Sequence, residues 1–407
     1  MTGAPENDSR FVFLDYLRAL AAWLVVWDHL ANVFLHDRGR VFLPAEFIRD
    51  NITAPLGIIQ DFGWFGVTLF FLISGFIISD RARVEGLWTF VVKRILRIYP
   101  MLAVALLLSI VLVASKDQVT VKNVLLNLTL ANYFIVPQVV LLGVAWTLAI
   151  EVAFYALTAA TQFSRQSPHR IGFNLAVVAL VIWQARAFGP NFFLLAATAT
   201  YLPILMMGQT VYWWLARRRL SAPWGFAYLA AAYGAFLWGV RTIHPDFLPV
   251  TNSYLVWIAY ALLLFVGLLH IRLPERRLVR FLSDTSYSVY LLHGIVGWAV
   301  LGALMTRAPL TVAIPLAAAA SLGASFITHL LIEKPCQRLA RRMTQGRGEK
   351  PTIRAPELAT GYASYYLRSA NRNVGTNPVA TLATVFSLPD GIRDAISKQL
   401  EVVLGGI

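Results

Sequence analysis

The first apolar stretch of this chain holds two residues with chemical potential, Arg18 and His29, which are 11 positions apart. At ~3.6 residues per turn this spacing is close to three helical turns, so both side chains share one helix face, ~16 Å apart along the axis. Histidine is the side chain best suited to proton transfer near neutral pH. The pair therefore predicts a catalytic site. The alternative is structural: Arg18 reaches the membrane interface, helped by Asp15 one turn before it, and His29 lies among outer headgroups or bonds a neighbouring helix.

A second pair, Arg94 and Arg97, stands three positions apart at the start of the third apolar stretch. Residues at that spacing are neighbours on a helix surface, so both guanidinium groups face one way. Two such groups can clamp a phosphate through paired hydrogen bonds. The residues alone favour ordinary anchoring of the helix end by positive charge, and a phosphate-binding entrance is the functional alternative.

Glu151 is the third candidate, because it lies near the middle of an apolar stretch between Trp146 and Tyr155. A carboxylate at that depth is costly unless it is protonated or paired with a cation or hydrogen-bond donors. Arg18 is a candidate partner. The residues alone leave open whether Glu151 contacts a substrate or belongs to a buried structural pair.

Two further patterns predict helix packing rather than chemistry. Ser286, Tyr290 and His293 fall on one helical face. Gly63, Gly66, Gly75 and Ser74 are small residues of the kind that let membrane helices approach closely.

The composition is that of an integral membrane protein. Of 407 residues, 58% are hydrophobic and 14% are charged, and the mean hydropathy is +0.63. A soluble domain is roughly half apolar and a quarter charged, so a water-soluble globule is excluded. The single cysteine, Cys336, excludes an intrachain disulfide and a cysteine-based zinc site.

Apolar stretches long enough to cross a hydrocarbon layer of ~30 Å recur about ten times. They are continuous and lack the alternation of barrel strands, so they predict helices. We expect an all-α fold, a polytopic membrane helix bundle of about ten transmembrane helices forming one domain over 1–340. The predicted spans are 11–35, 62–80, 98–114, 139–163, 172–189, 192–215, 224–240, 251–270, 285–306 and 309–332.

Positive charge predicts the sidedness of these spans. Lys and Arg concentrate in the even-numbered connections and directly after the last span. Because cytoplasmic connections carry that excess, both termini are predicted to be cytoplasmic, in a protein of the inner (plasma) membrane. The net charge of +14 then follows from topology, and no nucleic-acid partner is expected.

From about residue 351 the composition turns polar, so we predict a cytoplasmic tail over 351–407. Ile392, Ile396, Leu400 and Val403 fall on one face of a short predicted amphipathic helix. That apolar face could dock on the membrane domain, on a second subunit of a homo-oligomer, or on the lipid bilayer.

In their order along the chain, these clusters resemble the motifs of the membrane-bound acyltransferase 3 family, over about residues 11–340. The positions that carry the resemblance are Asp15, Arg18, His29, Gly63, Gly66, Val67, Phe70, Phe71, Ser74, Gly75, Arg94, Arg97, Ile98, Pro100, Trp146, Thr147, Leu148, Glu151, Phe154, Tyr155, Ser286, Tyr287, Tyr290, Leu291, His293, Glu333, Lys334 and Pro335.

The resemblance implies transfer of an acyl group, usually acetyl, from cytoplasmic acyl-CoA (acetyl-CoA) to a hydroxyl of a carbohydrate acceptor. Surface polysaccharides, exopolysaccharides and lipid-linked glycans are the acceptors it implies. Essential roles are implied for Arg18 with His29 and for Arg94 with Arg97. No metal is expected, because a thioester is already an activated acyl donor.

Depth in the membrane suggests a role for each group. Arg94 and Arg97 would bind the phosphates of acyl-CoA, and Arg18 would hold the pantetheine end or pair with Glu151. His29 would act as general base on the acceptor hydroxyl, or as the carrier in an acyl-enzyme relay. Trp146, Glu151 and Tyr155 would shape the reaction chamber or bind sugar.

Two other functions compete with this hypothesis. Buried ionisable groups in ten spans also suit a proton-coupled exporter, or a flippase of a glycan or lipid-linked sugar. The chain shows no internal repeat of the kind that many transporters carry. A non-catalytic scaffold in a polysaccharide assembly complex is the third possibility.

Overall fold

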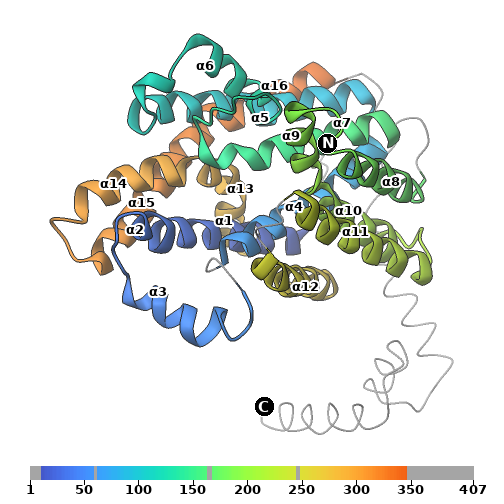
Figure 1. The fold of residues 1–407 in the computed structure, drawn as a ribbon, viewed down its shortest axis with the longest axis horizontal. Coiled ribbons are helices and arrows are strands. Elements are labelled where there is room, and N and C mark those ends of the chain that lie inside the picture. Colours follow the sequence, from blue (N-terminus) through green and yellow to red (C-terminus); the bar gives the residue numbers. More distant parts are fainter. Residues whose placement is uncertain (1–10, 59–61, 163–166, 244–247, 346–407) are drawn as a thin grey trace, which may run out of the picture. The chain divides into compact units, whose positions relative to one another are not determined.

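The structure, a computed structural model, describes residues 11–58, 62–162, 167–243 and 248–345. Its regular elements over those ranges are all helices (Figure 1), which confirms the all-α expectation for this part of the chain. The longer helices are α1 (Val12–Asp28), α4 (Gly63–Val84), α5 (Leu87–Leu112), α7 (Trp146–Gln162), α8 (Arg170–Trp183), α11 (Ala222–Ile243), α12 (Leu248–His270), α13 (Arg277–Leu292) and α15 (Leu310–Thr328). The shorter ones are α2 (Phe34–His36), α3 (Leu43–Ile48), α6 (Val121–Leu128), α9 (Pro190–Ala199), α10 (Leu202–Val211), α14 (Trp298–Leu304) and α16 (Lys334–Thr344).

The centre of the bundle is α4, which packs most extensively against α1 and α10 (Figure 1). A Cβ atom on Gly75 would lie only 1.8 Å from the carbonyl oxygen of Leu205 in α10. A Cβ atom on Gly66 would lie 2.7 Å from the carbonyl oxygen of Ala21 in α1. Glycine is therefore required at both contacts, which confirms the predicted packing role of these residues.

The remaining helices surround this centre in two groups. On one side of α1 lies α13, which packs against α15, and α16 packs against α5. On the other side, α11 contacts α8, α10 and α12. The first group matters most for function, because it brings the arginine-bearing part of α5 next to α13 and α16.

Seven helical segments are long and apolar enough to cross a membrane within the described ranges, so the chain is a membrane protein. They are Val12–His36, Gly63–Val84, Leu87–Leu112, Gly143–Thr161, Pro190–Ala216, Arg277–Leu304 and Leu310–Thr344. The other three predicted spans coincide with α8, α11 and α12. With 14 residues, α8 measures only ~21 Å at ~1.5 Å per residue. The count of ten crossings therefore stays a prediction.

Several helices extend beyond the predicted spans at their charged ends. The third span was expected to start at residue 98, whereas α5 begins at Leu87 and includes Arg94 and Arg97. Similarly, α13 begins at Arg277 and α16 continues to Thr344. The physical reason is that hydropathy marks the apolar part of a helix, and polar residues continue the helix past it.

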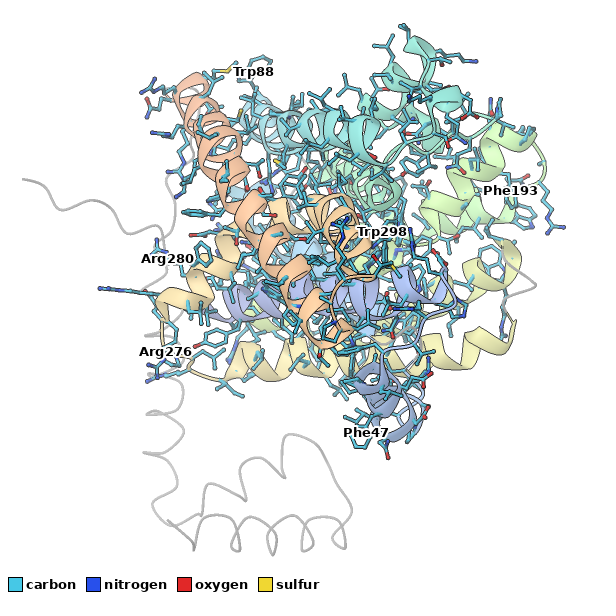
Figure 2. All side chains as sticks on the ribbon, turned by 90° about the vertical axis from the view of Figure 1, so that its left-hand side faces the viewer. Phe47, Trp88, Phe193, Arg276, Arg280 and Trp298 are labelled. Atoms are coloured by element: carbon cyan, nitrogen blue, oxygen red, sulfur yellow. The ribbon has the colours of Figure 1, made fainter. Side chains whose placement is uncertain are left out.

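Figure 2 shows Arg276 and Arg280, which belong to a predicted cytoplasmic connection, at one end of the bundle. Phe193, next to a predicted outer connection, lies at the opposite end. This separation agrees with the predicted alternation of connections. Which end faces the cytoplasm stays a prediction.

Three histidines each begin a π-helical turn: His29 in η1 (His29–Val33), His293 in η9 (His293–Gly297) and His329 in η10 (His329–Glu333). Such turns widen a helix locally and occur frequently at functional sites. The three histidines are therefore candidates for functional residues.

The chain divides after Thr352 into two units. The second unit and the predicted tail over 351–407, with its amphipathic helix, lie outside the described residues.

Candidate active site

His29 lies at the point where α1 passes into η1 and lines a cavity of about 1170 Å³, the His29 cavity. Its side chain is 26% exposed, so it faces this space rather than being enclosed. The Nδ1 atom lies 3.0 Å from the carbonyl oxygen of Val25. Because a carbonyl only accepts hydrogen bonds, Nδ1 carries the hydrogen and donates it. The neutral ring therefore keeps its lone pair on Nε2, which is the protonation pattern that a general base needs.

Aromatic side chains surround His29. The Trp298 ring lies nearly parallel to that of His29 at a centroid distance of 6.3 Å, and its Nε1 donates to the His29 carbonyl at 3.2 Å. Trp64 and Trp146 line the same cavity with their rings 5.3 Å apart. Figure 2 shows Trp298 among the helices of the bundle. The cavity thus offers several apolar ring faces around one imidazole.

A second histidine packs against His29. His293, which is fully buried, lies edge-on to His29 with the ring centroids 4.8 Å apart. Its Nδ1 lies 3.1 Å from the carbonyl oxygen of Val289 and 2.8 Å from that of Tyr290. Its Nε2 has no hydrogen-bond partner among the described residues. Sequence reasoning assigned His293 to packing alone, whereas the structure places it against the candidate base.

A much smaller cavity of about 60 Å³, the throat, lies next to the His29 cavity. Arg18, Arg97, Glu151 and Tyr155 line it. Glu151 accepts hydrogen bonds at Oε1 from Tyr155, and from Ser74 at 3.2 Å. These donors satisfy part of the hydrogen-bonding need of the carboxylate at this depth. Ser74, which sequence reasoning assigned to packing, is therefore also a partner of Glu151.

The third cavity, of about 760 Å³, is the vestibule. Its lining carries more cations than anions. The cations are Arg18, Arg81, Lys93, Arg94, Arg97, Lys334, Arg338 and Arg341, and the anions are Asp15, Asp80, Glu85, Asp284 and Glu333. The vestibule is therefore a wide polar space with net positive formal charge, which suits a polyanionic ligand.

Arg94 and Arg97 differ in their surroundings within the vestibule. Arg94 is 8% exposed, and its Nη2 lies 3.5 Å from Glu85 Oε2. Glu85 also accepts a hydrogen bond from Lys93 at 3.0 Å. Arg97 is only half-buried and lines both the vestibule and the throat. Arg94 is thus held by protein groups, although its buried Nε lacks a partner, and Arg97 is the arginine placed to meet a ligand in both spaces.

The throat adjoins both larger cavities, because it shares lining residues with each of them. The vestibule and the throat have Arg18, Arg97 and Tyr287 in common. The throat and the His29 cavity have Val67 and Tyr290 in common. A series of spaces therefore runs from the cationic lining of α5 and α16 to His29.

The predicted residues fall along this series rather than in one cluster. Trp146 accompanies His29, whereas Glu151 and Tyr155 accompany Arg18 and Arg97 in the throat. The three residues therefore line two adjoining cavities, and their role in shaping a reaction chamber stays a prediction. The helical positions 146, 151 and 155 span more than two turns of α7, which is why the tryptophan lines one space and the other two line the next.

Three lining residues were missed as functional candidates. Tyr290 hydrogen-bonds with Thr147 at 2.9 Å and borders both the throat and the His29 cavity. Tyr287 donates to the Ile98 carbonyl at 3.0 Å, next to Arg97 in sequence. Glu85 was missed because it stands in a connection, where a carboxylate looks solvated. The two tyrosines belong to the motif at 286–293, so a signal existed for them.

Over the described ranges, no group of three or more His, Cys, Asp or Glu side chains is arranged to hold a metal ion.

A family model described as an acyltransferase domain matches residues 11–330. The chain belongs to the acyltransferase 3 family. The match confirms the resemblance carried by the sequence motifs, and it covers the residues that line the throat and the His29 cavity. The helix α16, on one wall of the vestibule, lies beyond the matched region.

Two curated relatives of this acyltransferase are the exopolysaccharide production protein ExoZ of Rhizobium meliloti and nodulation protein 10 of Rhizobium leguminosarum bv. viciae. The first is 30% identical over 69% of this chain and 92% of its own length. The second is 28% identical over 69% of this chain and 82% of its own length. No solved structure matches the chain.

Proposed function

We propose that this protein transfers an acetyl group from cytoplasmic acetyl-CoA to a hydroxyl of a carbohydrate of the exopolysaccharide class, with His29 as general base. The observation that carries the proposal is the series of adjoining cavities from the cationic vestibule, through the throat, to His29. Family membership supports acyl transfer. The name of the Rhizobium meliloti relative supports the acceptor class.

The shape of acyl-CoA fits this series. Its polyanionic nucleotide occupies the vestibule, and its narrow, uncharged pantetheine arm enters the throat. Arg97 and Arg18 border both spaces, so they contact the phosphates and the start of the arm. Guanidinium groups bind phosphate oxygens through charge-assisted hydrogen bonds. Arg94, held by Glu85, supports this wall.

At the far end of the arm, the thioester meets the acceptor in front of His29. The acceptor oxygen attacks the thioester carbon while its proton passes to Nε2 of His29. The carbon–sulfur bond breaks, and the imidazolium then returns the proton to the departing thiolate. The hydrogen bond from Nδ1 to Val25 holds the tautomer that makes Nε2 the base.

The His29 cavity suits a carbohydrate acceptor. Trp64, Trp146 and Trp298 line it, as do charged groups, and aromatic side chains of this kind can pack against the apolar face of a sugar. If the predicted sidedness holds, this cavity opens to the outside of the membrane, so the acyl group crosses while the nucleotide stays in the cytoplasm. The acyl group reaches the acceptor either directly from the pantetheine arm or, in a relay, from a covalent acyl-His29 intermediate.

The test uses purified full-length protein in lipid nanodiscs with radiolabelled acetyl-CoA and exopolysaccharide oligosaccharides. The wild type is expected to transfer label to the glycan. His29→Gln should nearly abolish transfer, whereas the control His270→Gln, at an exposed histidine that lines none of the three cavities, should retain it. Proton-coupled transport of unmodified glycan by the wild type, without release of free CoA, would contradict the proposal and support the alternative function as an exporter.

A label that stays on the protein in a single turnover without acceptor, and disappears in His29→Gln, would indicate the relay. Release of free CoA only in the presence of acceptor would indicate direct transfer.

A further inference from the structure

The wall of the vestibule formed by α16 carries three cations with no acidic partner among the described residues. Lys334, Arg338 and Arg341 are exposed and line the vestibule. Their spacing of four and three residues places them on one face of the helix. On the facing wall the cations are paired, for example Lys93 and Arg94 with Glu85.

The acid nearest to these cations along the chain is already engaged. Glu333 accepts hydrogen bonds from Ser288 at 3.0 Å and from Gln337 at 3.1 Å. His329 Nδ1 lies 2.8 Å from the same carboxylate. Glu333 is therefore turned toward protein donors, and the α16 cations keep their charge for another ligand.

His329 adds an independent feature to this wall. It is 4% exposed and lines the vestibule. Its Nδ1 donates to Glu333. Its other ring nitrogen, Nε2, is buried and has no hydrogen-bond partner in the part of the chain that the structure describes. Unpaired polar atoms at such depth are uncommon, so each one calls for a ligand or another physical account. A polar ligand in the vestibule would account for it.

We propose that Lys334, Arg338 and Arg341 bind the 3′-phosphate of the adenosine of acetyl-CoA. The proposal rests on the proposed function and names the part of the donor that the enzyme recognises. Coenzyme A carries two separate anionic groups, a diphosphate and a 3′-phosphomonoester. The vestibule carries two separate cationic groups, on α5 and on α16, and these helices pack against each other.

The charges of the two groups suit this assignment. A phosphomonoester carries about −1.5 to −2 at neutral pH and offers three acceptor oxygens. It therefore suits unpaired cations better than an arginine already held by a carboxylate. Arg97 and Arg18, at the entrance of the throat, remain for the diphosphate.

Anionic lipid headgroups are the other source of phosphate for a cationic helix at a membrane surface. Arg342 allows the two to be distinguished, because it is exposed on the same helix but does not line the vestibule. A lipid contact would involve Arg342 as well as its neighbours, whereas a nucleotide in the vestibule would not.

The kinetic test compares acetyl-CoA with acetyl-3′-dephospho-CoA as donors in nanodiscs. Wild type and Arg342→Gln are expected to prefer acetyl-CoA by about tenfold or more in KM, because charge-assisted hydrogen bonds are lost with the phosphate. The double variant Arg338→Gln/Arg341→Gln is expected to use both donors with the same KM. A wild type without donor preference, or a double variant that retains it, would overturn the proposal.

A binding measurement separates this proposal from the proposed function. Adenosine 3′,5′-bisphosphate should bind wild type about tenfold or more tightly than AMP does, and the double variant should bind both equally. Equal binding of the two nucleotides to wild type would contradict the proposed 3′-phosphate site, even if acetyl transfer is found. Selective binding without acetyl transfer to any glycan would support the site and contradict the proposed acceptor reaction.

Discussion

The two large cavities of this protein differ in charge and in the kind of side chain that lines them. The vestibule has eight Lys or Arg and five Asp or Glu along its wall, and no tryptophan. The His29 cavity has two arginines, three acids and three tryptophans. One end is therefore suited to a phosphorylated nucleotide, and the other to a polyhydroxylated ring. Under the proposed function, donor and acceptor therefore approach from different ends and meet near His29.

The largest expected effect tests this comparison at His29, in the cavity lined by tryptophans. His29→Gln should lower kcat by about 10²–10⁴-fold, because the general base is lost. The affinity for acetyl-CoA, measured by calorimetry, should remain that of the wild type, since the nucleotide binds at the other end. A variant that loses donor affinity instead would place His29 in donor binding and remove the distinction between the two cavities.

The next largest effect distinguishes the roles of Arg94 and Arg97 in the vestibule. Arg97→Gln should raise the KM for acetyl-CoA about tenfold or more, because a phosphate contact is lost. Arg94→Gln should raise it less but lower the free energy of unfolding by about 1–3 kcal/mol, since Glu85 loses one of its buried partners. Thermal melting and steady-state kinetics check both. The reverse pattern would make Arg94 the ligand and Arg97 the structural residue.

A smaller effect tests how firmly the His29 segment is held. Trp298→Phe keeps an aromatic ring but removes the donor to the His29 carbonyl. We expect the free energy of unfolding to fall by about 1 kcal/mol, with a modest decrease in kcat. Trp183→Phe is the matched control, because Trp183 is 69% exposed on α8. Equal effects of the two substitutions would argue against a specific role for the Trp298 contact.

The least invasive test uses the native thiol of Cys336, which lies in α16 between Lys334 and Arg338 and is partly exposed. A membrane-impermeant maleimide should label it in inverted vesicles and not in right-side-out vesicles. Cys336→Ser provides the background. Labelling only from the outside would reverse the predicted orientation.

The sequence predicted the fold class and the key polar positions for clear physical reasons. Apolar runs report membrane helices directly, and glycines such as Gly75 report close helix contacts. Arg18, Arg97 and Glu151 were detectable because ionisable groups are conspicuous in apolar surroundings. The assignment of those groups to one throat required the packing of α1, α4, α5, α7 and α13, which depends on contacts far apart in the chain.

Other features were beyond the reach of residue types and spacing. Glu85 stands in a short polar connection, and nothing in its neighbourhood indicates that it is buried against Arg94. His293 matched a packing pattern because it repeats with Ser286 and Tyr290, and only the crossing of α13 and α1 brings it to His29. The division of the α7 residues between two cavities likewise depends on how neighbouring helices partition the space.

The throat has one further consequence, which concerns the electrochemical gradient of the membrane. Its volume of about 60 Å³ is far below the volumes of the two cavities that it adjoins, about 760 and 1170 Å³. Two guanidinium groups border it, and a hydrated sodium ion or a proton carried by water would meet both. Under the proposed function, such a constriction separates two water-filled cavities, so that acetyl transfer would not discharge the energy stored across the bilayer.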